Sequence, residues 1–252
     1  MTTRVNELGL PIGPELPDWT ARPRPPRAVM QGRYCRVAPL DPARHASELY
    51  AANSLDRAGR MWTYLFSGPY ASFDEYRAWL ETKAPSEDPL FFVFVDADSG
   101  RAVGLGSYLR IDPANGSVEV GHLQYSPLMQ RTAVATEAMY LMMKTAFELG
   151  YRRYEWKCDA LNARSRRAAE RLGFTFEGVF RQAVVYKGRN RDTAWFSIID
   201  SEWPQLDAAY RRWLDPANFD ATGRQLVSLE EIRRRQRTSR RDVSAETCNF
   251  PD

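Results

Sequence analysis

The chain has 252 residues, of which 44% are hydrophobic and 12% aromatic, a composition that suits a globular protein with a sizeable core. Its formal net charge of +3 excludes a protein that binds polyanions through its whole surface. Three cysteines, Cys35, Cys158 and Cys248, lie far apart without a CxxC pair, which argues against a disulfide framework and a zinc site.

No apolar stretch approaches the roughly 18 residues of a membrane-spanning helix, and the N-terminus lacks the apolar core of a signal peptide. We therefore expect a cytoplasmic protein without a membrane partner or a bound metal.

Residues 1–27 are expected to form an extended arm. Their prolines forbid a helix and favour polyproline II or turns. These prolines are Pro11, Pro14, Pro17, Pro23, Pro25 and Pro26.

The next segment predicts a strand and two helices. The strand covers residues 29–39, and Asp41 then caps a helix that has Pro42 at its first position and ends near Asn53. Ser72 begins a second helix, which runs to about residue 83.

Three strands are predicted in the middle of the chain. Residues 90–95 and 102–111 form a hairpin around the turn at residues 98–100. Asn115-Gly116 makes a second turn before a strand over residues 118–125.

The second half alternates helices and strands. A long helix is expected at residues 133–149 before Gly150, a strand at 154–158, a helix at 162–172 before Gly173, and strands at 175–186 and 192–199. This alternation implies an α/β fold in which helices cover a mixed sheet.

Residues 215–252 are expected to be weakly ordered, because a run of arginines there has few apolar partners. We favour a solvated helix end or tail, and the alternative is a tail that contacts RNA or the ribosome. The run consists of Arg233, Arg234, Arg235, Arg237, Arg240 and Arg241.

Two blocks of sequence carry a resemblance to a known family. The first joins residues 119–121 to residues 130–138, and the second joins residues 162–165 to residues 171–174 and 177–178. In order and spacing they resemble the acetyl-CoA motifs of the GNAT superfamily of N-acetyltransferases, and most of all its RimJ/RimL-type branch.

The resemblance spans roughly residues 30–205 and implies a GNAT domain at residues 28–214. It also implies acetyl-CoA as co-substrate, a primary amine as acceptor, and a sheet splayed between its fourth and fifth strands. A homodimer is left open.

A loop that runs into a helix N-terminus presents free N–H groups and a positive dipole end, which suits the pyrophosphate of coenzyme A. An ordinary helix start with small packing residues is the structural alternative. The residues expected to contact acetyl-CoA are Leu123, Gln124, Tyr125, Gln130, Arg131, Thr132, Ala133, Val134, Ala135, Thr136, Asn162 and Ser165. Ala133 departs from the family motif, which has a glycine there, and a methyl group narrows the approach of a ligand to the backbone.

Glu119 is the first candidate for the general base, and an arginine-paired strand carboxylate is its alternative role. His122 is a rival base that lies on the opposite face of the strand unless a bulge intervenes. By resemblance, Ser165 lies near the sulfur and donates to the departing thiolate. Ala169 replaces the tyrosine that serves many family members as general acid. No cysteine has an evident base beside it, so the amine is expected to attack the thioester directly.

The acceptor pocket is expected between the segment at residues 61–66 and the last hairpin. Trp62, Tyr64 and Tyr186 are the candidate contacts, and Trp62 or Tyr64 offers a ring for stacking. Ordinary packing against the sheet is the alternative for these rings. Two rival functions remain, a non-catalytic acyl-CoA-binding protein and a factor that contacts RNA or the ribosome through the arginine run.

Overall fold

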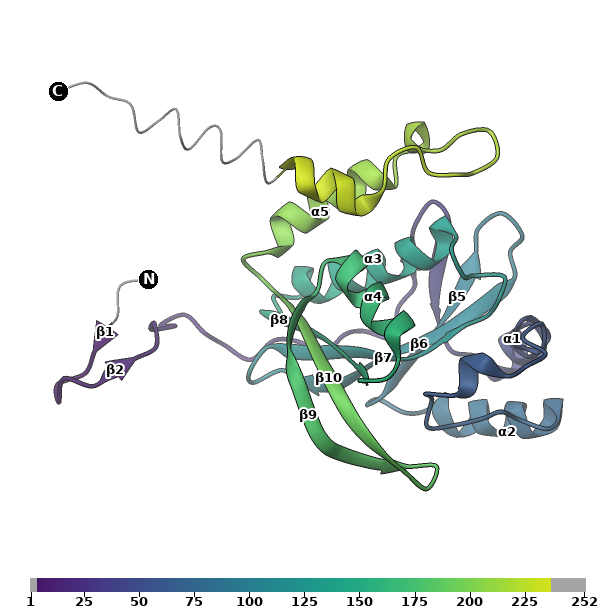
Figure 1. Ribbon diagram of the computed structural model, residues 1–252, viewed down its shortest axis with the longest axis horizontal. Coiled ribbons are helices and arrows are strands. Elements are labelled where there is room, and N and C mark those ends of the chain that lie inside the picture. Colours follow the sequence, from purple (N-terminus) through teal and green to yellow (C-terminus); the bar gives the residue numbers. More distant parts are fainter. Residues whose placement is uncertain (1–3, 237–252) are drawn as a thin grey trace.

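The structure, a computed structural model, describes residues 4–236 and centres on an eight-stranded sheet (Figure 1). The strand order is β3-β4-β5-β6-β7-β8-β10-β9. All neighbours pair antiparallel except β7 and β8, which are parallel. The strands are β3 (Met30–Gln31), β4 (Cys35–Pro39), β5 (Leu90–Asp96), β6 (Ala102–Asp112), β7 (Ser117–Tyr125), β8 (Arg153–Asp159), β9 (Thr175–Tyr186) and β10 (Arg189–Ile199).

Helices cover both faces of the sheet, as the sequence predicts (Figure 1). One face carries α1 and α2, which enclose a core around Leu49, Leu80 and Phe91. The other carries α3, α4 and α5 over a larger core that includes Met142 and Phe196. The helices are α1 (Pro42–Ser54), α2 (Phe73–Lys83), α3 (Ala133–Glu148), α4 (Ala163–Leu172) and α5 (Trp203–Trp213), with short 3₁₀ turns at Arg60–Trp62 and Pro216–Asn218.

The sheet opens between β7 and β8, the fourth and fifth strands of the sequence prediction. Their pairing runs from Ser117 opposite Arg153 to Val120 opposite Trp156 and then stops. Both strands continue, β7 to Tyr125 and β8 to Asp159. Backbone groups of β7 beyond Val120 that face β8 therefore have no strand partner on that side, and the predicted splay is confirmed.

The predicted helix ends are confirmed where side chains or glycine determine them. The Asp41 carboxylate accepts hydrogen bonds from the first turn of α1, and the Ser72 hydroxyl accepts one from the N–H of Glu75. Gly173 follows α4 with a φ of 107°, a left-handed conformation that a side chain would strain.

The single strand predicted for residues 29–39 is wrong. The segment forms two short strands, β3 and β4, joined by a turn in which the Gly32 N–H donates to the Cys35 carbonyl over 2.9 Å. The turn is held by Glu137 of α3, whose carboxylate accepts from the N–H groups of residues 33–35 at 2.9, 2.5 and 2.7 Å. Because this partner is about a hundred residues away, the local pattern does not reveal it.

The expected weak order beyond residue 214 is wrong for residues 215–236. Residues 229–236 are helical, and Leu229 and Ile232 are buried in the larger core. Helix α5 is an element that the sequence prediction lacks, although its buried residues Leu206, Ala209, Tyr210 and Trp213 follow a helical spacing. Arg237, Arg240 and Arg241 lie outside the described residues, and the division at residue 214 stays a prediction.

The N-terminal arm is extended and leaves the body of the molecule at its far end (Figure 1). It carries a small hairpin of β1 (Arg4–Val5) and β2 (Pro11–Ile12). Closer to the domain it is anchored, because the Trp19 indole donates to the Ala114 carbonyl over 2.7 Å.

Candidate active site

A bulge in β7 determines which side chains face the opening. The β6–β7 register shifts between Ser107 opposite Gly121 and Leu105 opposite Gln124, and His122 has a φ of 52° there. Glu119 precedes the bulge and His122 lies in it. Both side chains consequently lie on the α1–α2 face, where His122 contacts the Phe91 ring at 5.1 Å. The bulge that would bring His122 to the same face as Glu119 is therefore present.

Glu119 is buried, with 4% of its surface exposed, and two cations contact it. Its carboxylate lies 2.6 Å from Arg110 and 3.0 Å from Lys157. Lys157 also lies 2.8 Å from Glu155, the residue opposite Glu119 on β8. Burial raises the pKa of Glu119, and Lys157 and Arg110 oppose that rise. The arginine pairing that the sequence offered as an alternative is thus present.

His122 is held by a short polar contact. Its Nδ1 lies 2.9 Å from the Ser107 hydroxyl. Burial, and to a lesser extent the cations Lys83 and Arg110, lower the pKa of His122 to about 4. The imidazole is therefore neutral near neutral pH and can accept a proton only weakly.

The first turn of α3 presents the backbone groups expected for an anion. The Thr132 hydroxyl accepts from the Ala135 N–H over 3.4 Å, which leaves the N–H groups of Ala133 and Val134 without an intrahelical acceptor. Ala133 is the first helical residue and has helical rather than left-handed backbone, so its methyl group causes no strain. Gln130 donates to the Tyr125 carbonyl over 2.7 Å, and Arg131, with a φ of 64°, is exposed in the turn.

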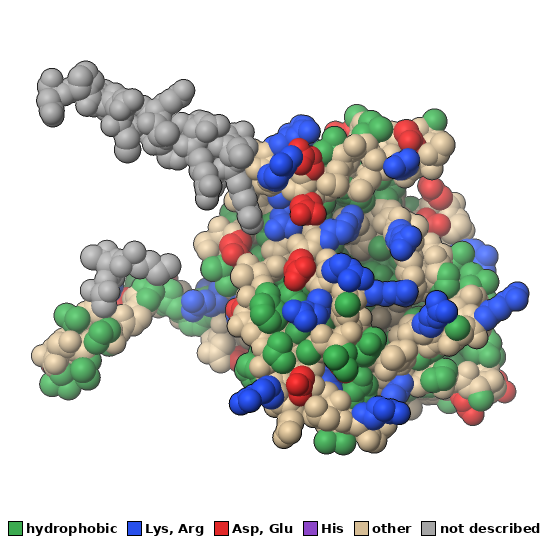
Figure 2. Space-filling view, in the orientation of Figure 1, with side chains coloured by type: hydrophobic (Ala, Val, Ile, Leu, Met, Phe, Trp, Pro, Cys, Tyr) green, Lys and Arg blue, Asp and Glu red, His purple; other side chains and the backbone are tan. Residues whose placement is uncertain are grey.

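Thr136 is placed differently from its neighbours. It is 2% exposed, and its hydroxyl accepts from Arg171 of α4 over 3.1 Å. Arg171 is a cation beside the first turn of α3 that was not predicted from the sequence, because only the packing of α4 against α3 brings it there. Basic side chains gather over α4 and the adjoining surface (Figure 2). These charges suit the phosphates of a nucleotide-containing cofactor.

Asn162 and Ser165 lie together at the start of α4. The Asn162 side chain accepts from the Ser165 N–H over 3.1 Å, so it caps the helix. The Ser165 hydroxyl accepts from the Trp156 indole over 3.0 Å, so its own proton is the group that it can donate. Burial raises the pKa of the nearby Cys158 thiol, and Ser165 opposes this through a hydrogen bond.

The end of β7 places its predicted residues on two faces. Leu123 and Tyr125 pack against the core under α3, and Tyr125 also contacts the Phe94 ring at 6.2 Å. Gln124 is 1% exposed on the α1–α2 face, where its side chain accepts from the Tyr76 hydroxyl over 2.9 Å. For all three residues, the backbone is therefore the part best placed for a ligand between β7 and β8.

The predicted acceptor residues come from two segments that do meet. Tyr64, between α1 and α2, donates to the Leu161 carbonyl over 3.3 Å, and Tyr186 of β9 donates to Asp159 over 2.8 Å. Trp62 is 6% exposed and packs edge-on against Tyr70 at 5.4 Å. Trp62 therefore has the alternative role that the sequence allowed, which is ordinary packing. A contact between Trp62 and an acceptor stays a prediction.

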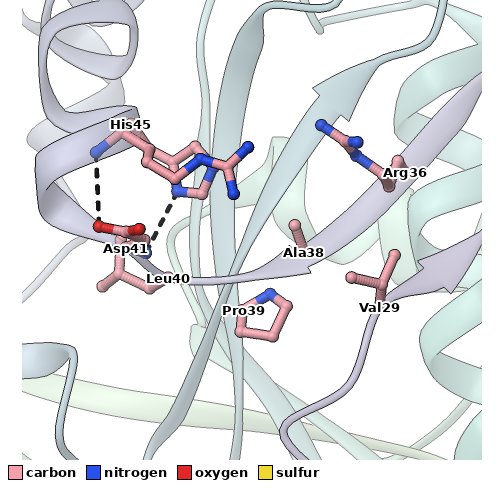
Figure 3. A pocket seen from close by; sticks show the side chains of 8 residues that line it. Val29, Arg36, Ala38, Pro39, Leu40, Asp41 and His45 are labelled. Carbon is pink, nitrogen blue, oxygen red and sulfur yellow. Dashed lines mark hydrogen bonds between the residues drawn. The ribbon is translucent and has the colours of Figure 1, made fainter.

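Ala169, in the place of the family tyrosine, is fully buried against the core. A pocket of about 270 Å³ lies elsewhere, between β4 and the first turn of α1 (Figure 3). Its lining includes Arg36, Asp41 and His45, whose Nδ1 accepts from the Asp41 N–H over 3.2 Å. We place the candidate site at the β7–β8 opening instead, because the bulge, the splay and the start of α3 coincide there.

Two further properties concern the part of the chain that the structure describes. Within residues 4–236, no cluster of three or more histidine, cysteine, aspartate or glutamate side chains is arranged to hold a metal ion. In the same range, no helix combines the length and the apolar character that crossing a bilayer requires.

The chain resembles proteins of one family. The acetyltransferase (GNAT) domain family matches residues 36–175. A GCN5-related N-acetyltransferase from Brucella melitensis is 51% identical, with a TM-score of 0.85 over 87% of this chain and 100% of its own. A protein from Chromobacterium violaceum, described as a probable acetyltransferase of the GNAT family, is 42% identical, with a TM-score of 0.72 over 77% of this chain and 98% of its own.

A protein described as RimL, a ribosomal L7/L12 α-N-protein acetyltransferase, is 19% identical, with a TM-score of 0.59 over 68% of this chain and 93% of its own. At that identity it shares the fold alone, so membership of the RimJ/RimL-type branch stays a prediction. No curated protein matches the chain in sequence.

Proposed function

The chain belongs to the GNAT acetyltransferase family, and we propose that it transfers the acetyl group of acetyl-CoA to an α-amine of a small molecule or a polypeptide N-terminus. The observation that supports this most is the coincidence of the β7–β8 opening with the bulge of β7 and the first turn of α3. In the proposal, the thioester, the candidate base and the anion site lie beside one another at these three features.

The proposed binding of coenzyme A follows from the groups present. The N–H groups of Ala133 and Val134 and the charges of Arg131 and Arg171 suit the pyrophosphate. The pantetheine arm would enter between β7 and β8 and pair with the free backbone of β7 beyond Val120. Ser165 and Asn162 lie at the start of α4, on the β8 side of this opening.

In the proposed mechanism the neutral amine attacks the thioester carbonyl directly. The new C–N bond forms, the C–S bond breaks, and the amine proton passes to Glu119, directly or through a water. A backbone N–H of residue 123 or 124 polarises the carbonyl, and the Ser165 hydroxyl donates to the departing thiolate. The buried thiols of Cys35 and Cys158, whose pKa values burial raises, are poorly suited to a covalent intermediate.

The preference for an α-amine rests on the pKa of the amine and on the strength of the bases that can take its proton. An α-amine has a pKa of about 7.7–8.0, so roughly a quarter is neutral in a cell, against about one in a thousand for lysine at about 10.4. The difference in deprotonation cost is about 3 kcal/mol. Burial raises the pKa of the Glu119 carboxyl against the opposing effect of two cations, yet a carboxylate stays a much weaker base than either amine. His122 has its pKa lowered to about 4. Both are weak bases, which suffice for an α-amine and serve lysine poorly.

The test uses matched acceptors and measures the release of coenzyme A. Alaninamide offers an α-amine, and Nα-acetyl-lysine amide offers only a side-chain amine. We expect kcat/KM to be at least about tenfold higher for alaninamide, part of the roughly 250-fold gap in neutral amine that the pKa values allow. Comparable values would refute the α-amine preference and leave acetyl transfer itself standing.

The non-catalytic alternative is supported by the two cations that hold Glu119, since such a carboxylate can be purely structural. Binding of acetyl-CoA without amine-dependent turnover would favour it. The alternative that involves RNA or the ribosome depends on arginines that lie partly outside the described residues. Of the described ones, Arg234 and Arg235 pair with Glu231. A cytoplasmic location and a homodimer stay predictions.

A further inference from the structure

Two segments that lie more than a hundred residues apart are tied together on the acceptor side. One is the connecting loop at residues 60–70, between α1 and α2. The other is the β9–β10 hairpin, with Lys187 in its turn at a φ of 47°. The Lys187 ammonium donates to the Trp62 carbonyl over 2.8 Å and to the Gly68 carbonyl over 2.9 Å. One side chain thus holds the loop near both of its ends.

Aromatic packing supports the same contact. The Phe66 ring, at the middle of the loop, lies 5.3 Å from the Tyr186 ring of the hairpin. The Arg191 guanidinium lies over both rings, at 5.1 Å from Phe66 and 5.7 Å from Tyr186. Arg191 is only 8% exposed, so these contacts are partly shielded from water.

The tied segments reach across the open end of β8. Tyr186 donates to Asp159, the last residue of β8, and Tyr64 donates to the Leu161 carbonyl just before α4. The hairpin extends past the end of β8 toward the segment that joins α1 and α2 (Figure 1). The loop and the hairpin therefore form a bridge beside the β7–β8 opening, on the face that carries Glu119 and His122.

A lysine is well suited to this position. The chain has 35 basic residues, but Lys83, Lys144, Lys157 and Lys187 are its only lysines. A compact ammonium with three rotatable donors can serve two converging carbonyl oxygens, whereas the planar fork of arginine fits a different geometry. An otherwise arginine-rich chain thus has lysine where two backbone carbonyls must be joined.

We infer that this bridge restricts the acceptor entrance, with Lys187 as the positioning residue that holds it, and that the acceptor is consequently a small free amine rather than the N-terminus of a folded protein. The inference rests on the proposed acetyl transfer and specifies its substrate class. A slender amine reaches the thioester past the bridge, and the body of a folded protein collides with residues 60–70 and the hairpin tip.

The test compares two acceptors that share an N-terminal alanine, alaninamide and a small folded protein that begins with alanine. In the wild type we expect kcat/KM for alaninamide to exceed that for the folded protein by at least about tenfold. Lys187→Met removes the donors and keeps the length of the side chain. It should lower this ratio by at least about fivefold, because the freed loop admits larger acceptors. The KM for acetyl-CoA should stay at its wild-type value, because that site lies at α3.

Lys144→Met is the matched control, since Lys144 pairs with Glu148 on the surface of α3, away from the bridge. The control should keep the wild-type ratio. Equal use of both acceptors by the wild type, or a ratio unchanged in Lys187→Met, would overturn the inference while acetyl transfer stands.

A second measurement is independent of turnover. Amide hydrogen exchange over residues 60–70 should be at least about tenfold faster in Lys187→Met than in the wild type and in Lys144→Met. Equal exchange in all three proteins would show that Lys187 does not hold the loop. If neither acceptor releases coenzyme A, the proposed function fails, and the exchange experiment still decides whether the bridge exists.

Discussion

Glu119→Gln is the substitution that separates a catalytic carboxylate from a structural one. Glu119 and Glu155 face each other on β7 and β8, and both contact the Lys157 ammonium, at 3.0 and 2.8 Å. Glu155→Gln is thus a matched control that removes the same charge from the same lysine. In the proposed mechanism only Glu119 takes the amine proton.

The expected magnitudes follow from these contacts. Breaking a buried ion pair costs about 3–5 kcal/mol, and each variant leaves Lys157 one carboxylate, so we expect both to lose stability toward the lower end of that range. Loss of a general base lowers kcat by roughly 10²-fold, or about 2.7 kcal/mol, in Glu119→Gln alone. The KM for acetyl-CoA should change little in either variant.

The assay measures kcat with alaninamide as acceptor, together with urea unfolding of each variant. The ratio of wild-type to Glu119→Gln rates should fall as the pH drops through the pKa of Glu119, because the wild-type carboxyl then becomes protonated. Taking the ratio cancels the titration of the amine itself. Equal loss of kcat in Glu119→Gln and Glu155→Gln would refute the reasoning, since it would assign the effect to the charge network.

Three further predictions concern the cofactor site, the bulge and the fold. Ala135→Glu places volume and negative charge at the first turn of α3 and should weaken acetyl-CoA binding at least about tenfold, or ~1.4 kcal/mol. Calorimetry measures the affinity, and Ala135→Gln is the neutral control. Unchanged affinity in Ala135→Glu would remove the proposed anion site. Burial lowers the pKa of His122 from 6.5 to about 4, so the folded state binds fewer protons than the unfolded state in that window and stability falls as the pH drops through it. Between about pH 7 and pH 4, the free energy of unfolding should therefore fall by about 3 kcal/mol less in His122→Gln than in the wild type. An equal fall in both proteins would contradict the burial argument. Glu137→Ala leaves three N–H groups of the β3–β4 turn without their acceptor. It should lower the free energy of unfolding, measured in urea, by at least about 3 kcal/mol. A decrease below about 1 kcal/mol would show that water replaces the carboxylate.

Local signals in the sequence predicted the elements well. Asp41 and Ser72 cap α1 and α2 through hydrogen bonds within their own first turns, so the sequence around them contains the whole interaction. The same holds for Gly173, whose left-handed backbone ends α4. The resemblance to GNAT motifs placed Thr132 to Ala135 at the first turn of α3, where the structure has them.

Contacts between segments that are distant in the sequence were not predicted. The β3–β4 turn depends on Glu137, and the cation beside the first turn of α3 is Arg171 of a later helix. Lys187 reaches the loop at residues 60–70 across more than a hundred residues. No periodicity or motif relates these partners, because their proximity arises only when the sheet and its covering helices assemble.

The bulge in β7 is an intermediate case. Strict alternation along the strand would place Glu119 and His122 on opposite faces, and the sequence analysis made that conditional on a bulge. The structure has the bulge, with His122 in a left-handed conformation that nothing in its side chain requires. The pairing of β6 with β7 causes it, so the arrangement of the site depends on sheet register rather than on local propensity.

Amine-dependent release of coenzyme A tests the central claim most directly. The purified chain would be mixed with acetyl-CoA, with and without alaninamide, and the free thiol and the mass of the amine followed together. Our account predicts that thiol release requires the amine and yields the N-acetylated product in equal amount. It also predicts that Ala135→Glu slows the release at least about tenfold at limiting acetyl-CoA. Tight binding of acetyl-CoA with no amine-dependent release from any class of amine would contradict the account and favour a non-catalytic acyl-CoA-binding protein.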